Sequence, residues 1–150
     1  MKIIAVCGGS GSGKSHFSKL LSNKLPGNTS VLSLDSYYRD FSHFPPDKRI
    51  KINFDAPESI EYDLIIKHIV NLKSGVKIEC PTYSYASQTR LSKTVTIEPP
   101  SYLIIEGILI FCNEKLRNLF DFSIFLDIDR ETRLQRIVKR DLVERNRGKN

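Results

Sequence analysis

The feature that most constrains the fold is an eight-residue segment near the start of the chain, GGSGSGKS (Gly8–Ser15). It fits the pattern G-x-x-x-x-G-K-[ST], in which glycines let successive backbone N–H groups surround an anion. A buried strand should precede such a loop, and a helix should follow it with its positive end toward the anion. The preceding KIIAVC and the helically spaced leucines that follow meet both requirements. The sequence therefore predicts a phosphate-binding loop rather than an ordinary glycine-rich turn.

The two residues that end this loop have the most specific expected roles. Lys14 would supply a positive charge to the outer phosphates of a nucleotide, and the Ser15 hydroxyl can bind Mg²⁺. The residues expected to bind the nucleotide are Gly8, Gly9, Ser10, Gly11, Ser12, Gly13, Lys14 and Ser15.

Apolar segments alternate with turn signals along the rest of the chain, and this order predicts an α/β fold. Such a fold has a parallel sheet flanked by helices on both faces, with ligands at the carboxyl ends of the strands. Residues 36–56 are predicted to form a long loop, and residues 76–98 an inserted β-hairpin. The predicted strands are Lys2–Cys7, Ser30–Leu34, Tyr102–Gly107 and Phe122–Ile128; the predicted helices are Lys14–Leu25, one that Pro57 opens and Gly75 closes, and one from Arg130 capped by Asp129.

Two carboxylates fall at the predicted ligand edge of the sheet. Asp35 ends the second strand, where it could take the proton of an acceptor hydroxyl or simply cap a turn. Glu106 ends the strongly apolar YLIIE segment, where a buried charge is costly unless it has a partner. A role on the magnesium side of a nucleotide is therefore favoured for Glu106.

Two further positions admit a functional and a structural interpretation. Asp55 and Glu58 have capping-box spacing, which makes Asp55 a candidate helix N-cap. Tyr83 in the hairpin could stack on a planar base or pair with an aromatic residue across the strands. On spacing alone, the structural interpretation is favoured for both residues.

Composition narrows the class of protein. The chain has 150 residues, 40% hydrophobic and 27% charged, as expected of one globular domain with no membrane-spanning run. Three dispersed cysteines predict reduced thiols in a cytoplasmic protein. The net charge of +6 suits phosphate-rich ligands. The basic residues of the chain gather in Arg130–Lys149, a pattern that on its own predicts a solvated helix face.

The absence of other motifs restricts the reaction. The guanine-binding pattern N-K-x-D and the D-x-x-G pattern of GTPases do not occur in the sequence, and a motor or helicase would need a longer chain. A small basic protein with this loop is most economically a kinase of a small acceptor.

Several segments together resemble the uridine kinase family over essentially the whole chain. They are GGSGSGKS, LSLDSYYRD, NFDAPE, PTYSYASQTR, LIIEGIL and RLQRIVKRDLVERNR, in that order. The resemblance implies a P-loop NTPase fold, with residues 1–150 as one kinase domain whose lid starts at about 140–150. It also implies Mg²⁺-dependent phosphoryl transfer from ATP or GTP to the 5′-hydroxyl of uridine or cytidine, as in pyrimidine salvage.

The resemblance also assigns roles by position. Asp35 matches the catalytic aspartate, with Lys14 and Arg140 as further catalytic residues, and the basic final helix becomes a phosphate clamp. Ser15 and Glu106 would lie at the metal. The implied acceptor-binding residues are Asp55 for the ribose, Tyr83 and Gln88 for the base, and Arg140 and Arg147 of the lid.

The chain departs from the family pattern at four places. Gln88 stands where the family usually has a histidine, Ile137 replaces the second arginine of a pair that begins at Arg136, and Asn146 replaces a lid glycine. The sequence ends at Asn150, before the strand and helix with which the family continues.

These departures leave two alternatives open: a P-loop kinase of another small acceptor, or a nucleotide-binding protein without turnover. The expected partner is a nucleoside, with neither nucleic acid nor membrane, and a homo-oligomer stays open.

Overall fold

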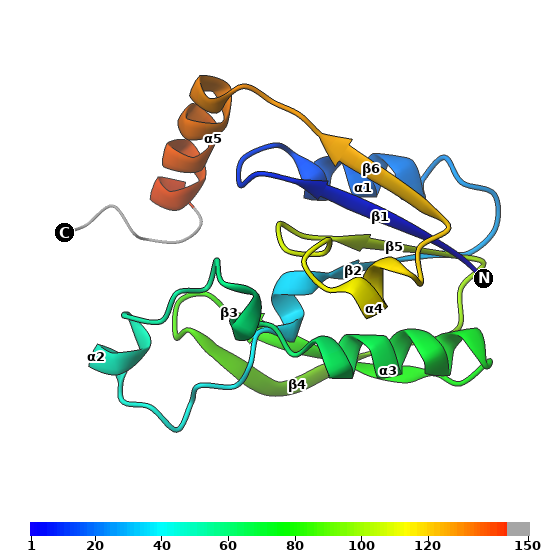
Figure 1. Ribbon diagram of the computed structural model, residues 1–150, viewed down its shortest axis with the longest axis horizontal. Coiled ribbons are helices and arrows are strands. Elements are labelled where there is room, and N and C mark those ends of the chain that lie inside the picture. The colour runs from blue at the N-terminus through cyan, green and yellow to red at the C-terminus, as the bar shows by residue number, and fades with distance from the viewer. Residues whose placement is uncertain (144–150) are drawn as a thin grey trace.

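A four-stranded parallel sheet forms the centre of the computed structural model, which describes residues 1–143 (Figure 1). The strand order is β2-β5-β1-β6, so the strand that leads into the glycine-rich loop is flanked on both sides. Because these strands are parallel, their carboxyl ends meet at one edge. The strands are β1 (Lys2–Gly8), β2 (Thr29–Ser33), β5 (Tyr102–Glu106) and β6 (Phe122–Leu126).

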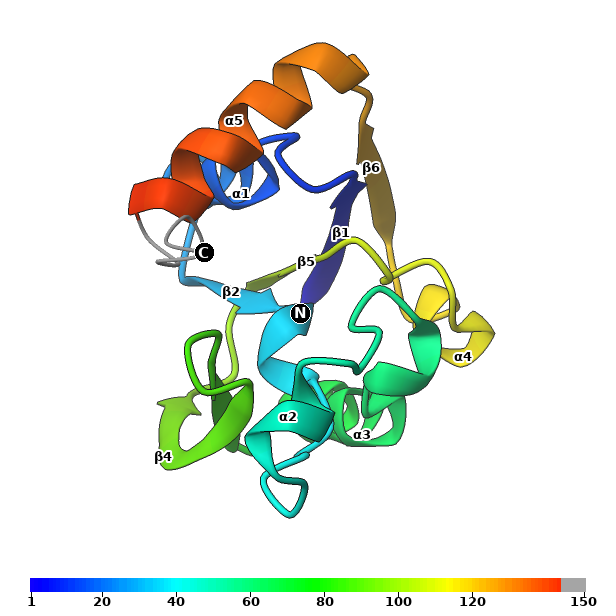
Figure 2. The ribbon, with the colours of Figure 1, turned by 90° about the vertical axis from the view of Figure 1, so that its left-hand side faces the viewer.

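Helices cover both faces of this sheet (Figures 1 and 2). Alternate residues of β1 point to opposite sides, as the strand period requires: Ile3 and Ala5 join the larger core, while Ile4 and Val6 join the smaller one. The side chains of α1 (Lys14–Ser22) close the smaller core, and those of α3 (Tyr62–Lys73) the larger. The predicted two-sided α/β arrangement is confirmed.

The inserted hairpin is also confirmed, and it lies outside the main sheet. Strands β3 (Ile78–Ser84) and β4 (Thr89–Ile97) form a separate antiparallel pair, with an irregularity between Pro81 and Thr82. The hairpin packs against a short 3₁₀ turn, η1 (Leu34–Tyr37), which directly follows β2. The insertion therefore approaches the ligand edge of the main sheet from one side.

The chain between β2 and α3 differs from the prediction. Pro57 opens only a 3₁₀ turn, η2 (Pro57–Ser59), and α3 begins at Tyr62. The reason is tertiary, because Ile60 forms an antiparallel bridge with Tyr38 and is extended. The predicted loop contains a short helix, α2 (Pro46–Arg49).

The remaining boundaries are close to those predicted. Helix α1 ends at Ser22, one turn before the predicted Leu25, and a short helix, α4 (Glu114–Arg117), precedes β6. Helix α5 (Arg130–Val143) starts as predicted, with the Asp129 carboxylate accepting the backbone N–H of Thr132 at 2.8 Å. Within residues 1–143, no helix has the length and apolar composition needed to cross a membrane.

Candidate active site

The glycine-rich loop connects β1 to α1 with the backbone geometry that an anion cradle needs. Gly13, at the N-cap of α1, has φ 87°, and Gly11 has φ 76°. Residues that carry a side chain rarely adopt this left-handed backbone conformation. A Cβ on Gly11 would also lie only 2.5 Å from the Arg133 carbonyl oxygen. The two glycines therefore provide both the turn and the close approach of α5.

Lys14 is held inside the cradle. Its side chain is 8% exposed, and its ammonium donates to the Gly9 carbonyl oxygen at 3.0 Å. Burial lowers the pKa of the Lys14 ammonium, and the carboxylates of Glu106 and Asp35 oppose that shift. A partly dehydrated cation beside the glycine-rich loop suits a multiply charged phosphate.

Ser15 and Glu106 meet at the base of the same cradle. The Ser15 hydroxyl donates to Glu106 Oε1 at 2.9 Å, and Glu106 is 7% exposed. Burial raises the pKa of the Glu106 carboxyl, Asp35 adds to the rise, and the Ser15 hydrogen bond and Lys14 oppose it. A buried carboxylate beside a more exposed hydroxyl is chemically suited to Mg²⁺, which binds one or two protein oxygens beside substrate phosphates. Residues 1–143 contain no larger His/Cys/Asp/Glu cluster that could hold a metal.

Asp35 lies in η1, immediately beyond the carboxyl end of β2. Its charge acts on both Lys14 and Glu106, so it faces the phosphate cradle. The hydroxyl of Tyr85, from the hairpin loop, donates to Asp35 Oδ2 at 2.5 Å. Tyr85 was not among the residues expected from sequence, because its partner lies fifty positions away.

One cleft of about 1470 Å³ joins the cradle to the hairpin and to the loop before α3. Most of the residues predicted to act in the site line this single cleft. They are Ser10, Gly11, Gly13, Lys14, Ser15, Asp35, Asp55, Tyr83, Gln88, Glu106 and Arg140. Gly8, Gly9 and Ser12 belong to the same loop but do not line this cleft.

The far wall of the cleft is aromatic. The ring of Tyr83 contacts those of Tyr38, Phe54 and Tyr85, with centroids 5.1, 6.2 and 5.6 Å away. Tyr83 therefore belongs to an aromatic cluster and lines the cleft at the same time.

Gln88 also lines the cleft. It is the one non-glycine residue with positive φ in the part of the chain that is described, at 53°.

The interpretation of Asp55 as a helix N-cap is wrong. No side chain caps η2, whose N-cap position is Ala56. Instead, the backbone N–H of Asp55 donates to the Asn53 side chain at 3.0 Å, and Asp55 lines the cleft. A local turn at Asn53 thus presents the Asp55 segment to the ligand space.

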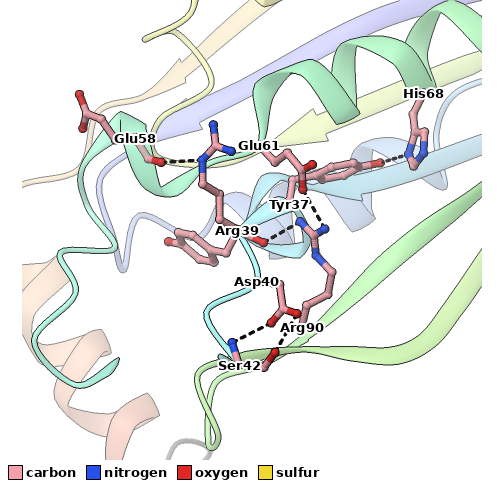
Figure 3. Close-up of polar contacts among 9 residues, drawn as sticks. Tyr37, Arg39, Asp40, Ser42, Glu58, Glu61, His68 and Arg90 are labelled. Atoms are coloured by element: carbon pink, nitrogen blue, oxygen red, sulfur yellow. Dashed lines mark hydrogen bonds and ion pairs between the residues drawn. The ribbon is translucent and has the colours of Figure 1, made fainter. Parts of the chain in front are cut away.

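Arg90 fixes the hairpin beside this wall (Figure 3). Its guanidinium forms an ion pair with Glu61 at 2.8 Å and donates to the Tyr38 carbonyl oxygen at 2.7 Å. The three residues come from β4, from the turn before α3 and from the segment after η1. This anchor was not predicted, since no local pattern links residues so far apart.

Helix α5 lies across the outside of the glycine-rich loop. Arg133 and Arg136 donate to the carbonyl oxygens of Ser10 and Gly11 at 3.5 and 3.4 Å. Leu134 and Val138 on this helix are exposed, whereas the Ile137 side chain lies against Gly11. Arg140 lines the cleft, whereas Arg147 and Asn146 lie outside the described residues.

The sequence matches one family of kinases along almost its whole length. The sequence model of the phosphoribulokinase/uridine kinase family matches residues 3–150. Uridine kinases of Streptococcus gordonii and Streptococcus pneumoniae (strain Hungary19A-6) are each 42% identical to the chain over 147 residues. These matches cover 97% of this chain and 70% and 69% of the two relatives, respectively.

Solved structures share the fold. A candidate fructose transport system kinase from Silicibacter sp. TM1040 superposes with a TM-score of 0.74 and 26% identity, over 94% of this chain and 72% of that one. A candidate uridine kinase from Bacillus stearothermophilus has a TM-score of 0.65 and 16% identity, over 96% of this chain and 83% of the other. The architecture is therefore the P-loop kinase fold.

Proposed function

The chain belongs to the phosphoribulokinase/uridine kinase family, and on that basis we propose that it phosphorylates the 5′-hydroxyl of uridine and cytidine with ATP or GTP. The observation that carries the proposal is the single cleft in which the phosphate cradle, Asp35 and the Asp55–Tyr83–Gln88 wall meet. A phosphoryl-transfer enzyme needs a donor site, a base and an acceptor site in reach of one another. Residues 1–150 would form one kinase domain.

The donor side consists of the loop and the start of α1. Backbone N–H groups of the loop would bind the phosphates, and the Lys14 ammonium would leave Gly9 for the outer phosphate oxygens. Ser15 and Glu106 would hold Mg²⁺, which when bound neutralises charge on the phosphates. Arg140 of α5 would add a further positive charge during transfer.

The reacting atoms lie between Lys14 and Asp35. The acceptor hydroxyl passes its proton to the Asp35 carboxylate as its oxygen forms a bond to the γ-phosphorus. The bond between that phosphorus and the β–γ bridging oxygen breaks, and the nucleoside diphosphate leaves with the electron pair. Asp35 then releases the proton to water, so the products are a nucleoside monophosphate, a nucleoside diphosphate and H⁺.

The acceptor side would read the sugar and the base separately. Asp55 would accept hydrogen bonds from the ribose hydroxyls, which predicts poor use of 2′-deoxynucleosides. Tyr83 would contact the base, and the Gln88 amide can donate or accept, so that it suits either uracil or cytosine. Arg147, beyond the described residues, would complete the lid with Arg140. Because Ile137 lacks a guanidinium, we expect a raised KM for the nucleoside.

A second candidate is a P-loop kinase of another small acceptor. The likeness to the candidate fructose transport system kinase favours it, since that structure is 26% identical to this chain.

The Asp35 carboxylate is held within the cleft, which favours turnover over a nucleotide-binding role without catalysis. The three cysteines are free thiols, which supports a cytoplasmic location. A role in pyrimidine salvage would follow from uridine and cytidine as acceptors.

The test measures the formation of nucleoside diphosphate from ATP and from GTP, with Mg²⁺ and a panel of acceptors. The panel holds uridine, cytidine, their 2′-deoxy analogues, purine nucleosides, pantothenate and sugar phosphates. We expect uridine and cytidine to be the best acceptors, with little discrimination between them. Turnover on a non-nucleoside alone would exclude the nucleoside kinase and favour the second candidate.

A further inference from the structure

We propose that the Tyr85 hydroxyl is a positioning group for Asp35, holding one carboxylate oxygen so that the other faces the acceptor hydroxyl. The proposal rests on the function proposed above, in which Asp35 takes the acceptor proton. It adds a second residue to the general base, Asp35, and makes the hairpin part of the phosphoryl-transfer machinery. Without it, the hairpin would serve only to recognise the nucleoside.

The contact itself is short and directional. The Tyr85 hydroxyl donates to Asp35 Oδ2 at 2.5 Å, and both side chains are partly buried in the wall of the cleft. A hydrogen bond to a charged acceptor is shorter and stronger than one between neutral groups. Because the phenol takes up Oδ2, Oδ1 is the oxygen that an acceptor hydroxyl would reach.

Asp35 needs such a partner because its backbone does not fix its side chain. It follows β2 in a short 3₁₀ turn, and rotation of the carboxylate about its own side-chain bonds would carry Oδ1 away from the acceptor. Its charged neighbours, Lys14 and Glu106, lie on the phosphate side of the cleft. A donor from the opposite wall therefore balances the pull of Lys14 on the carboxylate.

Tyr85 is itself held in place from two directions. Its ring packs edge to face on Tyr83, with centroids 5.6 Å apart and an interplanar angle of 81°. At the far end of the same loop, Arg90 ties the hairpin to Glu61 and to the backbone of Tyr38. A group that positions a base must be rigid, and these contacts provide that rigidity.

The chemical consequence concerns the rate of transfer more than binding. A carboxylate already oriented toward the hydroxyl loses less conformational freedom on reaching the transition state. Contact with the acceptor itself is left to Tyr83 and Gln88. Removing only the hydroxyl should therefore lower kcat and leave KM nearly unchanged.

The decisive variant is Tyr85→Phe, which keeps the ring and its packing. We expect kcat with uridine to fall by about tenfold, the effect of one hydrogen bond to a charged group. The KM for uridine and the affinity for ATP should change by less than about twofold. An unchanged kcat in the Phe variant would overturn the proposal.

A matched control is Tyr62→Phe, because the Tyr62 hydroxyl also makes one hydrogen bond, to the Leu109 carbonyl oxygen at 2.8 Å, and does not line the cleft. This variant should keep the wild-type kcat. In an Asp35→Asn background, Tyr85→Phe should cause no further loss, since the hydroxyl acts through the carboxylate. An equal loss in both backgrounds would show that Tyr85 acts independently of Asp35, contrary to the proposal.

A second readout separates this inference from the proposed function. In protein labelled with ¹³C at aspartate carboxyl carbons, the Asp35 resonance can be assigned from its absence in Asp35→Asn. At fixed pH, Tyr85→Phe should shift that resonance and Tyr62→Phe should not. Failure of the wild-type chain to phosphorylate any nucleoside would refute the proposed function, whereas an unmoved carboxyl resonance would refute the Tyr85 contact.

Discussion

Among individual residues, the buried charge of Lys14 is best explained by the binding of phosphate. Its ammonium is buried against the Gly9 carbonyl oxygen, and burial lowers its pKa. A neutral backbone oxygen offsets the lost hydration poorly, so an incoming phosphate is a better partner for this cation. The contact with Gly9 therefore holds the side chain where the outer phosphates would bind.

We predict that Lys14→Ala weakens ATP binding by about 10- to 100-fold, the loss of one charge-assisted contact. Calorimetric titration of ATP measures this effect, with a thermal denaturation scan to show that the variant is folded. Lys19→Ala, on the exposed side of the same helix, is the matched control and should bind ATP normally. Unchanged affinity in a folded Lys14→Ala protein would contradict the phosphate-loop assignment.

Asp35 makes a separate prediction, because a base affects the rate rather than nucleotide binding. Asp35→Asn keeps the size of the side chain and an oxygen for the Tyr85 hydroxyl, but the amide cannot take up the proton. We expect kcat to fall by about 10²- to 10⁴-fold with ATP affinity preserved, measured by diphosphate formation and calorimetry. The control is Asp40→Asn, since Asp40 lies outside the cleft and bonds only to Ser42 among the contacts in the described chain. Wild-type turnover in Asp35→Asn would leave Asp35 as a structural turn residue.

At the scale of elements, α3 and η1 are joined by a partly buried polar contact. The Tyr37 hydroxyl and His68 Nδ1 lie 3.0 Å apart (Figure 3). Burial lowers the pKa of His68 below its usual 6.5, and the charge of Lys67 adds to the shift. The neutral imidazole is thus the form that the fold favours.

This shift predicts how stability depends on pH. Below the usual value of 6.5 the unfolded chain binds the His68 proton more readily than the folded one, so the free energy of unfolding rises with pH. The stabilisation is complete above that value and is lost as pH falls from there toward the lowered pKa of the folded state. Urea denaturation between about pH 5 and about pH 7.5 should show a smaller rise for His68→Gln than for the wild type. The exposed His43→Gln should retain the full rise, and identical curves for His68→Gln and wild type would contradict the assignment.

The elements also show which parts of the structure a sequence can predict. The loop at Gly8–Ser15 follows from local rules, since its glycines and the flanking strand and helix are adjacent in the chain. The helix expected from Pro57 was placed too early, because Ile60 pairs with Tyr38 and stays extended until Tyr62. Only long-range contact could reveal that difference.

The candidate site divides in the same way. The positions of Asp35 and Glu106 at one edge were predictable, because Asp35 follows β2 and Glu106 ends β5 in one parallel sheet. Asp55 and Tyr83 took their functional interpretation from the family resemblance, since spacing alone favoured a cap and a strand pair. Tyr85 and Arg90 could not be predicted, because their partners are set by how the hairpin docks on η1.

At the scale of the whole molecule, the strand order within residues 1–143 leaves β6 at one edge of the sheet. Two of its aromatic side chains are largely exposed, Phe122 at 58% and Phe125 at 62%. An edge strand with unpaired backbone groups and apolar side chains is prone to pair with another chain. This edge therefore favours self-association of the 150-residue chain.

We predict concentration-dependent association of the chain in sedimentation velocity, and its reduction by Phe125→Lys, which places a charge on the edge. Phe44→Lys is the control, because Phe44 is also exposed but lies in the loop before α2, away from the sheet edge. It should associate like the wild type. A wild-type chain that stays monomeric at all concentrations would count against this role for β6.

The pairing of β1 also sets when the protein can become active during its synthesis. Lys2 pairs with Tyr102, and Ile4 pairs with Phe122, so both partner strands of β1 lie far later in the sequence. At a translation rate of about 5–20 residues per second, β1 and the loop behind it wait for several seconds without a sheet. Such non-local pairing also slows folding, because the loop-closure entropy must be overcome before the contacts form. The glycine-rich loop therefore acquires its binding geometry only after β5 and β6 have joined β1.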